Sequence, residues 1–97
     1  MAALSDGELR ILLADMEGWT HLGNAIHKEF RFPGFTGSVA FVNRVAEAAE
    51  AAGHHPDIEI HYQRVLISLS THDEGGVTEK DVSLAREIDR AGDANDR

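Results

Sequence analysis

Histidine is concentrated in one short stretch of this sequence. Four of the six histidines (His54, His55, His61 and His72) lie in GHHPDIEIHYQRVLISLSTHDEGG, residues 53–76. Imidazole has an unperturbed pKa of about 6.5, so rings brought together in a folded protein can supply both a general acid and a general base at neutral pH. The cluster therefore permits acid-base catalysis, with metal binding or a plain polar surface as the alternatives.

The histidines meet the requirements of two other chemistries less well. A zinc site needs three or four ligands in tetrahedral geometry, and the sequence has no His-x-x-x-His or comparable spacing, so we expect no metal. Ser68 and Asp73 lie near His72, as in a Ser-His-Asp hydrolase, but no nucleophile elbow accompanies them. The absence of cysteine excludes disulfides, thiolate nucleophiles and Cys-based zinc sites.

Length and composition predict one globular domain over residues 1–97. Hydrophobic residues make up 42% of the chain and charged residues 27%, values close to those of average soluble domains. The formal net charge of -8 disfavours binding to nucleic acid or anionic membranes, so we expect neither as a direct partner. No apolar run approaches the roughly 20 residues that span a bilayer, and the N-terminus lacks a secretory signal, so we expect a cytoplasmic protein.

Apolar residues recur at helical spacing in three segments. The first helix is predicted over about residues 6–16, behind a Ser-x-x-Glu capping box, and the second over 35–52, with Gly53 as its C-terminal stop. The third helix begins after Thr78 and precedes a tail, residues 91–97, that we expect to fray. The histidine-rich stretch thus lies between the second and third helices.

Strand-like segments fill the spaces between these helices. Gly23-Asn24 predicts a two-residue turn within a first pair of strands. A second pair is predicted over 57–62 and 64–71 with a reversal near Gln63, and a single continuous strand is the alternative. The order α-β-β-α-β-β-α favours an α+β domain, with a four-stranded antiparallel sheet and three helices on one face.

These elements predict where the candidate catalytic side chains lie. His54 and His55 follow the end of the second helix, and Pro56 restricts His55 to an extended conformation. His72 ends the last strand, in front of a glycine-containing loop. Each histidine alone would be an ordinary surface residue, so a function requires that the fold bring them to one pocket.

Two carboxylates occupy positions from which they could orient these rings. Glu50 lies one helical turn before His54, and Asp81 lies in the first turn of the last helix. A solvated helix residue would equally explain Glu50, and helix capping would equally explain Asp81. Trp19 and Tyr62 could stack on a ligand or pack against the protein.

Taken together, these positions resemble the signature of the pterin-4a-carbinolamine dehydratases. The matching residues are Glu50, His54-His55-Pro56, Tyr62, His72 and Asp81, at the spacing of that signature. Flanking segments are similar to the same family: FRF at 30–32, AFVNRVAE at 40–47, THDEGGVTEKD at 71–81 and LAREID at 84–89. The resemblance covers roughly residues 5–90, and the chain departs from it at Ile58, Ile60, His61 and Gln63.

The resemblance implies a hydro-lyase that needs no cofactor. Members dehydrate 4a-hydroxytetrahydrobiopterin to quinonoid dihydrobiopterin, which recycles the pterin used by aromatic amino acid hydroxylases. The hydroxyl leaves as water after gaining a proton and the adjacent ring N–H loses one, so one acid and one base suffice. By this resemblance His54 and His72 are the acid/base pair, and His55 positions the pterin or serves as an auxiliary acid or base.

The resemblance also implies supporting residues and partners. Glu50 and Asp81 match the acidic positions and would orient the histidines, and Tyr62 and Trp19 are our candidates for substrate binding. Family members assemble as homodimers or homotetramers.

Some relatives of this fold are binding modules rather than enzymes. One is the dimerisation cofactor of a homeodomain transcription factor in animals, and degenerate relatives are thought to assist assembly of a carbon-fixing enzyme in some bacteria. Degenerate forms tend to lose the catalytic histidines, whereas this chain keeps all three. The enzyme is therefore the favoured interpretation, and a non-catalytic protein-binding module is the alternative.

Overall fold

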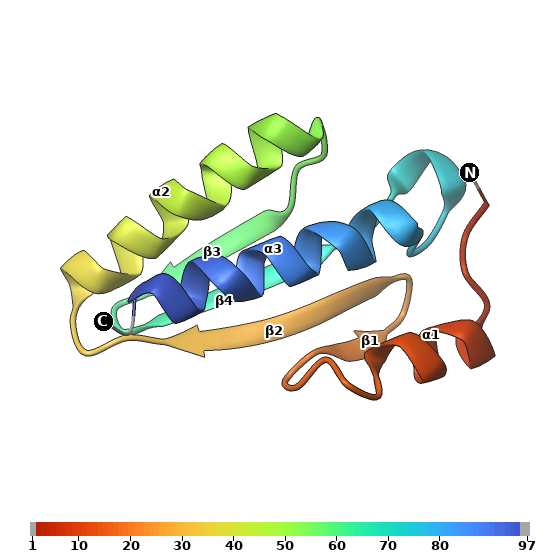
Figure 1. The fold of residues 1–97 in the computed structure, drawn as a ribbon, viewed down its shortest axis with the longest axis horizontal. Coiled ribbons are helices and arrows are strands. Elements are labelled where there is room, and N and C mark those ends of the chain that lie inside the picture. The colour runs from red at the N-terminus through yellow and green to blue at the C-terminus, as the bar shows by residue number, and fades with distance from the viewer. Residues whose placement is uncertain (1, 96–97) are drawn as a thin grey trace.

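Three α-helices and four strands alternate along residues 2–95, the part of the chain that the computed structural model describes (Figure 1). Their order is α-β-β-α-β-β-α, so the predicted α+β class is confirmed. The elements are α1 (Asp6–Leu13), β1 (Thr20–Leu22), β2 (Ala25–Arg31), α2 (Phe35–Ala52), β3 (Asp57–His61), β4 (Arg64–Leu69), a short 3-10 turn η1 (His72–Glu74), and α3 (Glu79–Asn95).

The four strands form one antiparallel sheet in the order β1-β2-β4-β3. In the central pair, β2 and β4, Ile26 lies opposite Leu69 and Phe30 lies opposite Val65. The chain reverses at Gln63, where β3 turns back into β4, so the predicted reversal is confirmed and the single continuous strand is wrong. This topology leaves β1 and β3 as the two edges of the sheet.

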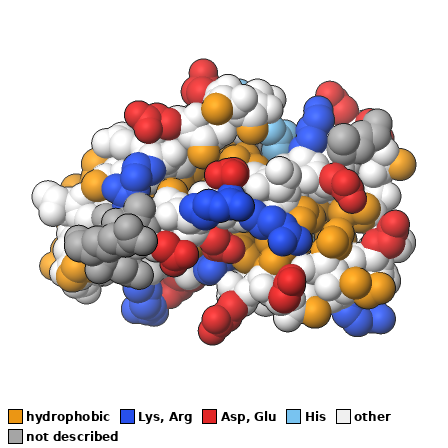
Figure 2. Space-filling model, viewed as in Figure 1, with side chains coloured by type: hydrophobic (Ala, Val, Ile, Leu, Met, Phe, Trp, Pro, Cys, Tyr) orange, Lys and Arg blue, Asp and Glu red, His pale blue; other side chains and the backbone are white. Residues whose placement is uncertain are grey.

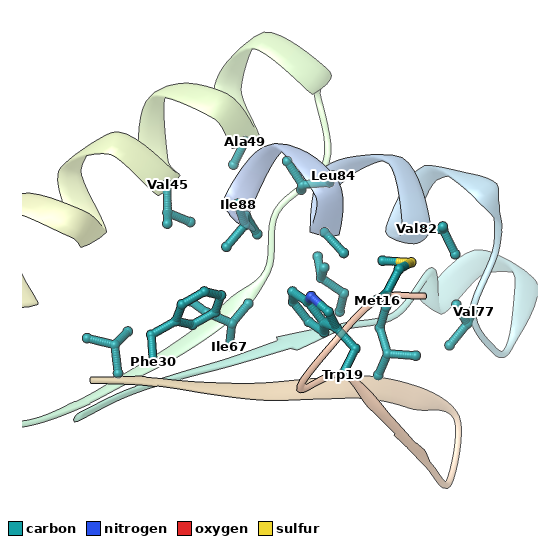
Figure 3. Packing of buried hydrophobic residues seen from close by; sticks show 14 of the residues in the cluster. Met16, Trp19, Phe30, Val45, Ala49, Ile67, Val77, Val82, Leu84 and Ile88 are labelled. Carbon is teal, nitrogen blue, oxygen red and sulfur yellow. The ribbon is translucent and has the colours of Figure 1, made fainter. Parts of the chain in front are cut away.

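One face of the sheet is covered by α2 and α3, which lie side by side (Figure 1). Alternate residues of β2 and β4 point into the layer between sheet and helices, because successive side chains of a strand face opposite sides (Figure 3). The fully buried side chains of this layer include Ile26, Phe41, Val45, Val65, Ile67, Leu69, Leu84 and Ile88. α1 adds Leu9 to the same core.

α1 begins as predicted but ends earlier. Ser5 and Glu8 form a reciprocal capping box, and the backbone N–H of Ser5 that donates to Glu8 lowers the pKa of the Glu8 carboxyl. The helix stops at Leu13 rather than at residue 16, because the N–H of Met16 bonds to the Leu13 carbonyl three residues back (3.0 Å). Met16 is nevertheless buried, so apolar spacing continues beyond the end of the helical hydrogen bonds.

α3 extends through most of the predicted tail. The chain is helical as far as Asn95, and residues 96 and 97 of the tail predicted to fray lie outside the described residues. Gly92 is buried where a Cβ would come within 3.2 Å of the Phe30 ring, so this part of α3 packs closely on the sheet. Within residues 2–95, no helix combines the length and apolar character that a membrane span requires.

Candidate active site

His54 is held at the C-terminal end of α2 by a tight turn. Gly53 adopts the left-handed conformation (φ 63°), which glycine reaches without the steric cost of a Cβ. The backbone N–H of His54 then bonds to the Ala49 carbonyl (3.1 Å) and completes the helix cap. The ring is 13% exposed, and its Nε2 lies 2.5 Å from Oδ1 of Asp81 in α3.

Asp81 is fully buried and joins three segments of the chain. Its Oδ2 accepts hydrogen bonds from the backbone N–H of Thr78 (2.9 Å) and from the hydroxyl of Thr71 (2.8 Å), while Oδ1 faces His54. The Thr78 contact confirms the predicted cap of the last helix. An ionised carboxylate can only accept hydrogen bonds, so with Asp81 ionised the proton in this contact belongs to Nε2 of His54.

His55 pairs with Glu50 rather than leaving Glu50 for His54. Nε2 of His55 lies 2.6 Å from Oε2 of Glu50, and the two side chains are 66% and 77% exposed. By its spacing along the helix Glu50 could also orient His54, but the left-handed turn after α2 directs His54 toward Asp81 instead. A contact between two side chains this exposed is weak, so Glu50 orients His55 without anchoring it strongly.

His72 reaches the same region from the other end of the histidine-rich stretch. β4 ends at Leu69, two residues earlier than the predicted strand, so His72 begins η1 instead of ending the strand, and the N–H of Gly75 bonds to the His72 carbonyl (3.1 Å). The N–H of Thr71 bonds to the Gly76 carbonyl (2.9 Å), which closes the base of this loop. Backbone hydrogen bonds therefore hold the short loop that carries His72. The His72 side chain itself is exposed to solvent.

The three predicted catalytic histidines meet in one pocket. The pocket has a volume of about 310 Å³ and is lined by Gly53, His54, His55, Ser70, Thr71, His72, Asp73 and Lys80. Sequence reasoning gave no role at this site to Thr71 or Lys80, although each adjoins a residue of the signature in the chain. His61 lies away from the pocket on β3, where its Nε2 is 3.0 Å from Glu59.

The geometry also bears on the two rejected chemistries. Among residues 2–95, no three His, Asp or Glu side chains are arranged to hold a metal ion. The serines near His72 bond elsewhere: the Ser68 hydroxyl is 2.7 Å from Nδ1 of His27, and the Ser70 hydroxyl donates to the Asn24 carbonyl (2.6 Å). Among the described residues, the hydroxyls of Ser68 and Ser70 therefore have partners other than the three imidazoles that line the pocket.

The two aromatic residues predicted to bind substrate lie outside this pocket. Trp19 is 5% exposed, and its indole N–H donates to both carboxylate oxygens of Asp89 (3.0 and 3.1 Å). Tyr62 lies in the β3–β4 turn, at the opposite end of β3 from the histidines. Trp19 is thus a core residue with a paired N–H and Tyr62 belongs to a turn, and their role in substrate binding stays a prediction.

Tyr62 has a backbone conformation that predicts a stabilising substitution. Its φ of 53° lies in the left-handed region, which costs a non-glycine residue about 1–2 kcal/mol. Because the side chain is 64% exposed, Tyr62→Gly should raise the free energy of unfolding by about 0.5–1 kcal/mol, measured by urea denaturation. Tyr62→Ala, which keeps a Cβ, is the matched control. A glycine variant no more stable than the alanine variant would contradict the prediction. A raised KM for dehydration in the glycine variant would support a role of Tyr62 in substrate binding.

Comparisons with known proteins agree with this geometry. Residues 2–91 match the family model described as Pterin 4 alpha carbinolamine dehydratase. A protein from Roseiflexus sp. (strain RS-1), provisionally named a pterin-4-alpha-carbinolamine dehydratase, is 55% identical over 86 residues, covering 89% of this chain and 92% of its own length. A relative with the same provisional name from Mycobacterium sp. (strain KMS) is 46% identical over 89 residues, covering 92% and 95%.

Two solved structures share the fold. A protein from Brucella melitensis described as a transcriptional coactivator/pterin dehydratase superposes with a TM-score of 0.89 at 34% identity, covering 93% of this chain and 98% of its own. A pterin dehydratase-like protein identified as a RuBisCO assembly factor in the alpha-carboxysome has a TM-score of 0.64 at 23% identity, covering 76% and 86%. At that identity the second likeness concerns the fold alone.

Proposed function

This chain belongs to the pterin 4 alpha carbinolamine dehydratase family, and we propose that it dehydrates 4a-hydroxytetrahydrobiopterin to quinonoid dihydrobiopterin and water. The observation that carries the proposal is the convergence of His54, His55 and His72 on one pocket. Their side chains can donate and accept protons near neutral pH, which is all that this dehydration requires. No cofactor enters the proposed reaction.

The hydrogen bonds of the pocket support different roles for the histidines. Loss of water breaks the bond between C4a and its hydroxyl, removes the proton of N5 and forms the double bond between C4a and N5. His54 is the proposed base, because Asp81 holds its Nε2–H and would stabilise the imidazolium that forms when Nδ1 takes the proton. His72 is the proposed acid that protonates the departing hydroxyl, and His55 positions the pterin.

A stopped-flow assay of 4a-hydroxytetrahydropterin dehydration tests this function directly. The substrate also loses water in buffer, so the readout is the acceleration over buffer at increasing protein concentration. We expect the wild-type protein to accelerate the reaction in proportion to its concentration. A dehydration rate with the wild-type protein equal to the rate in buffer alone would contradict the dehydratase proposal and favour the protein-binding alternative.

The alternative function, a non-catalytic binding module, has support from one relative. The Brucella melitensis protein is described as a coactivator as well as a dehydratase, and it is 34% identical to this chain. The presence of all three histidines in one pocket favours the enzyme, because a purely structural adaptor has no need of this arrangement.

We also propose a setting for the reaction. The enzyme would act in the cytoplasm, in the recycling of tetrahydrobiopterin for an aromatic amino acid hydroxylase. It would form a homodimer or homotetramer, which is supported by the edge position of β3 and by the exposure of Ile60 (39%) on that strand. Light scattering at micromolar concentration tests the assembly, and a monomer there would contradict it.

A further inference from the structure

His27 and Ser68 form a pair that is separate from the pocket of the three candidate catalytic histidines (the histidine pocket). Figure 2 shows a histidine surface, in pale blue, near the end of α2, where that pocket lies. His27 is instead in β2, opposite Ser68 of β4. Their neighbours Ile26 and Leu69 are buried in the core, so His27 and Ser68 point to the face of the sheet that is turned away from α2 and α3.

The hydrogen bonds of His27 determine its tautomer. Nε2 lies 3.3 Å from the backbone carbonyl oxygen of Leu22, which can only accept a hydrogen bond, so in the neutral ring the proton is on Nε2. Nδ1 is then an acceptor, and the Ser68 hydroxyl, 2.7 Å away, is its donor. A hydroxyl that donates to an imidazole, while a third group orients that imidazole, is the arrangement that activates a nucleophilic serine.

The pair lines a hollow that is large enough for a small molecule. The hollow has a volume of about 360 Å³, within the range of about 300–1,000 Å³ typical of small-molecule sites. His27 and Ser68 are both half-buried, so solvent molecules and small solutes can reach the pair. Leu66 also lines the hollow, two residues before Ser68 in the same strand, and offers an apolar surface to a short acyl chain.

We propose that Ser68 is a nucleophilic serine, activated by His27, that accepts small acyl groups from reactive esters. Oγ of Ser68 attacks the carbonyl carbon of the ester while its proton passes to Nδ1 of His27. The bond between that carbon and the leaving oxygen then breaks, the alcohol departs with the proton that His27 took, and an acyl ester of Ser68 remains. Because His27 supplies general-base assistance alone, the ester must carry a good leaving group, such as a nitrophenol.

Acetylation by p-nitrophenyl acetate, with the modified residues located by peptide mass spectrometry, tests the proposal. Ser70 is an internal control, because it lies two residues after Ser68 and its hydroxyl donates to the Asn24 carbonyl (2.6 Å) instead of to an imidazole. We expect Ser68 to be acetylated about 10²-fold faster than Ser70, at the lower end of the range for general-base catalysis. His27→Ala should lower the rate at Ser68 to that at Ser70. His27→Gln should do the same, because its amide can keep a hydrogen bond to Ser68 but is not a base.

His21→Ala is the matched control for removal of an imidazole. His21 lies on the neighbouring strand β1 and does not line this hollow, so its substitution should leave the acetylation of Ser68 at the wild-type rate. Ser68→Ala should keep the wild-type rate of dehydration, so the two proposed activities are tested separately. Equal acetylation of Ser68 and Ser70 in the wild-type protein, or an unchanged rate at Ser68 in both His27 variants, would overturn the proposal. An equal loss in His21→Ala and His27→Ala would also overturn it.

Discussion

Replacing both His54 and His72 by alanine is expected to lower the acceleration of 4a-carbinolamine dehydration by about 10² to 10⁴, the range typical of positioned acid-base catalysis. The two rings come from opposite ends of a stretch of sequence and line the same pocket. Without them, the pocket loses the two imidazoles proposed to exchange protons with the departing hydroxyl and with N5, and only His55 remains. The stopped-flow assay that tests the wild-type protein measures the loss.

Stability controls separate catalysis from folding in this experiment. His72 is exposed, so His72→Ala should leave the free energy of unfolding nearly unchanged. His54→Ala removes the partner of a buried carboxylate and should cost about 1–3 kcal/mol. His54→Gln is the sharper variant, because an amide N–H can replace the Nε2 donor to Asp81 but cannot act as a base near neutral pH.

His61→Ala is the matched control for removal of an imidazole. His61 lies on β3, its ring is hydrogen-bonded to the exposed Glu59, and it does not line the pocket. Its substitution should leave the dehydration rate at the wild-type value. Full activity in the His54→Ala/His72→Ala double variant, or equal losses in that variant and in His61→Ala, would rule out the proposed acid/base pair.

Substitution of Asp81 by alanine should have the largest effect on stability, a loss of about 3–5 kcal/mol in the free energy of unfolding. The carboxylate is fully buried and accepts from Thr78, Thr71 and His54. Removing it leaves the buried N–H of Thr78 without this acceptor and takes a partner from the half-buried Thr71 and His54, and an unsatisfied buried donor is costly. Against a total stability of about 5–15 kcal/mol, a loss of this size is large and measurable by urea denaturation.

Two further variants show which property of Asp81 matters. Asp81→Asn keeps the shape and one acceptor oxygen, so it should cost less than the alanine substitution while still disturbing His54 and lowering the dehydration rate. Glu79→Ala removes an exposed carboxylate from the same helical turn and should cost no more than about 1 kcal/mol. If the free energy of unfolding of Asp81→Ala lay within about 1 kcal/mol of the wild-type value, the hydrogen bonds to this carboxylate would not be a main source of stability at the site.

The predictions from sequence agree best with the structure where the local structure depends on residues that are neighbours in the chain. The capping box at Ser5, the left-handed stop at Gly53 and the reversal at Gln63 all follow from local backbone preferences, and all are present. The end of α1 was missed by three residues because the apolar spacing continues to Met16 after the helical hydrogen bonds have ended. In most helices the buried apolar residues lie within the segment that has helical hydrogen bonds. Here the buried Met16 lies beyond the last residue of α1.

The sequence by itself determined the order of elements, the three catalytic candidates and, through the full spacing of the signature, the family. Only the tertiary structure decided the partners of those candidates. Asp81 lies 27 residues after His54 and becomes its neighbour because α3 packs against α2, whereas the nearer Glu50 pairs with His55. The packed sheet likewise places Trp19 beside Asp89 and Tyr62 in the β3–β4 turn, neither of them in the lining of the histidine pocket. Spacing along the chain specifies local geometry, but contacts between distant segments are set by packing, which no short pattern contains.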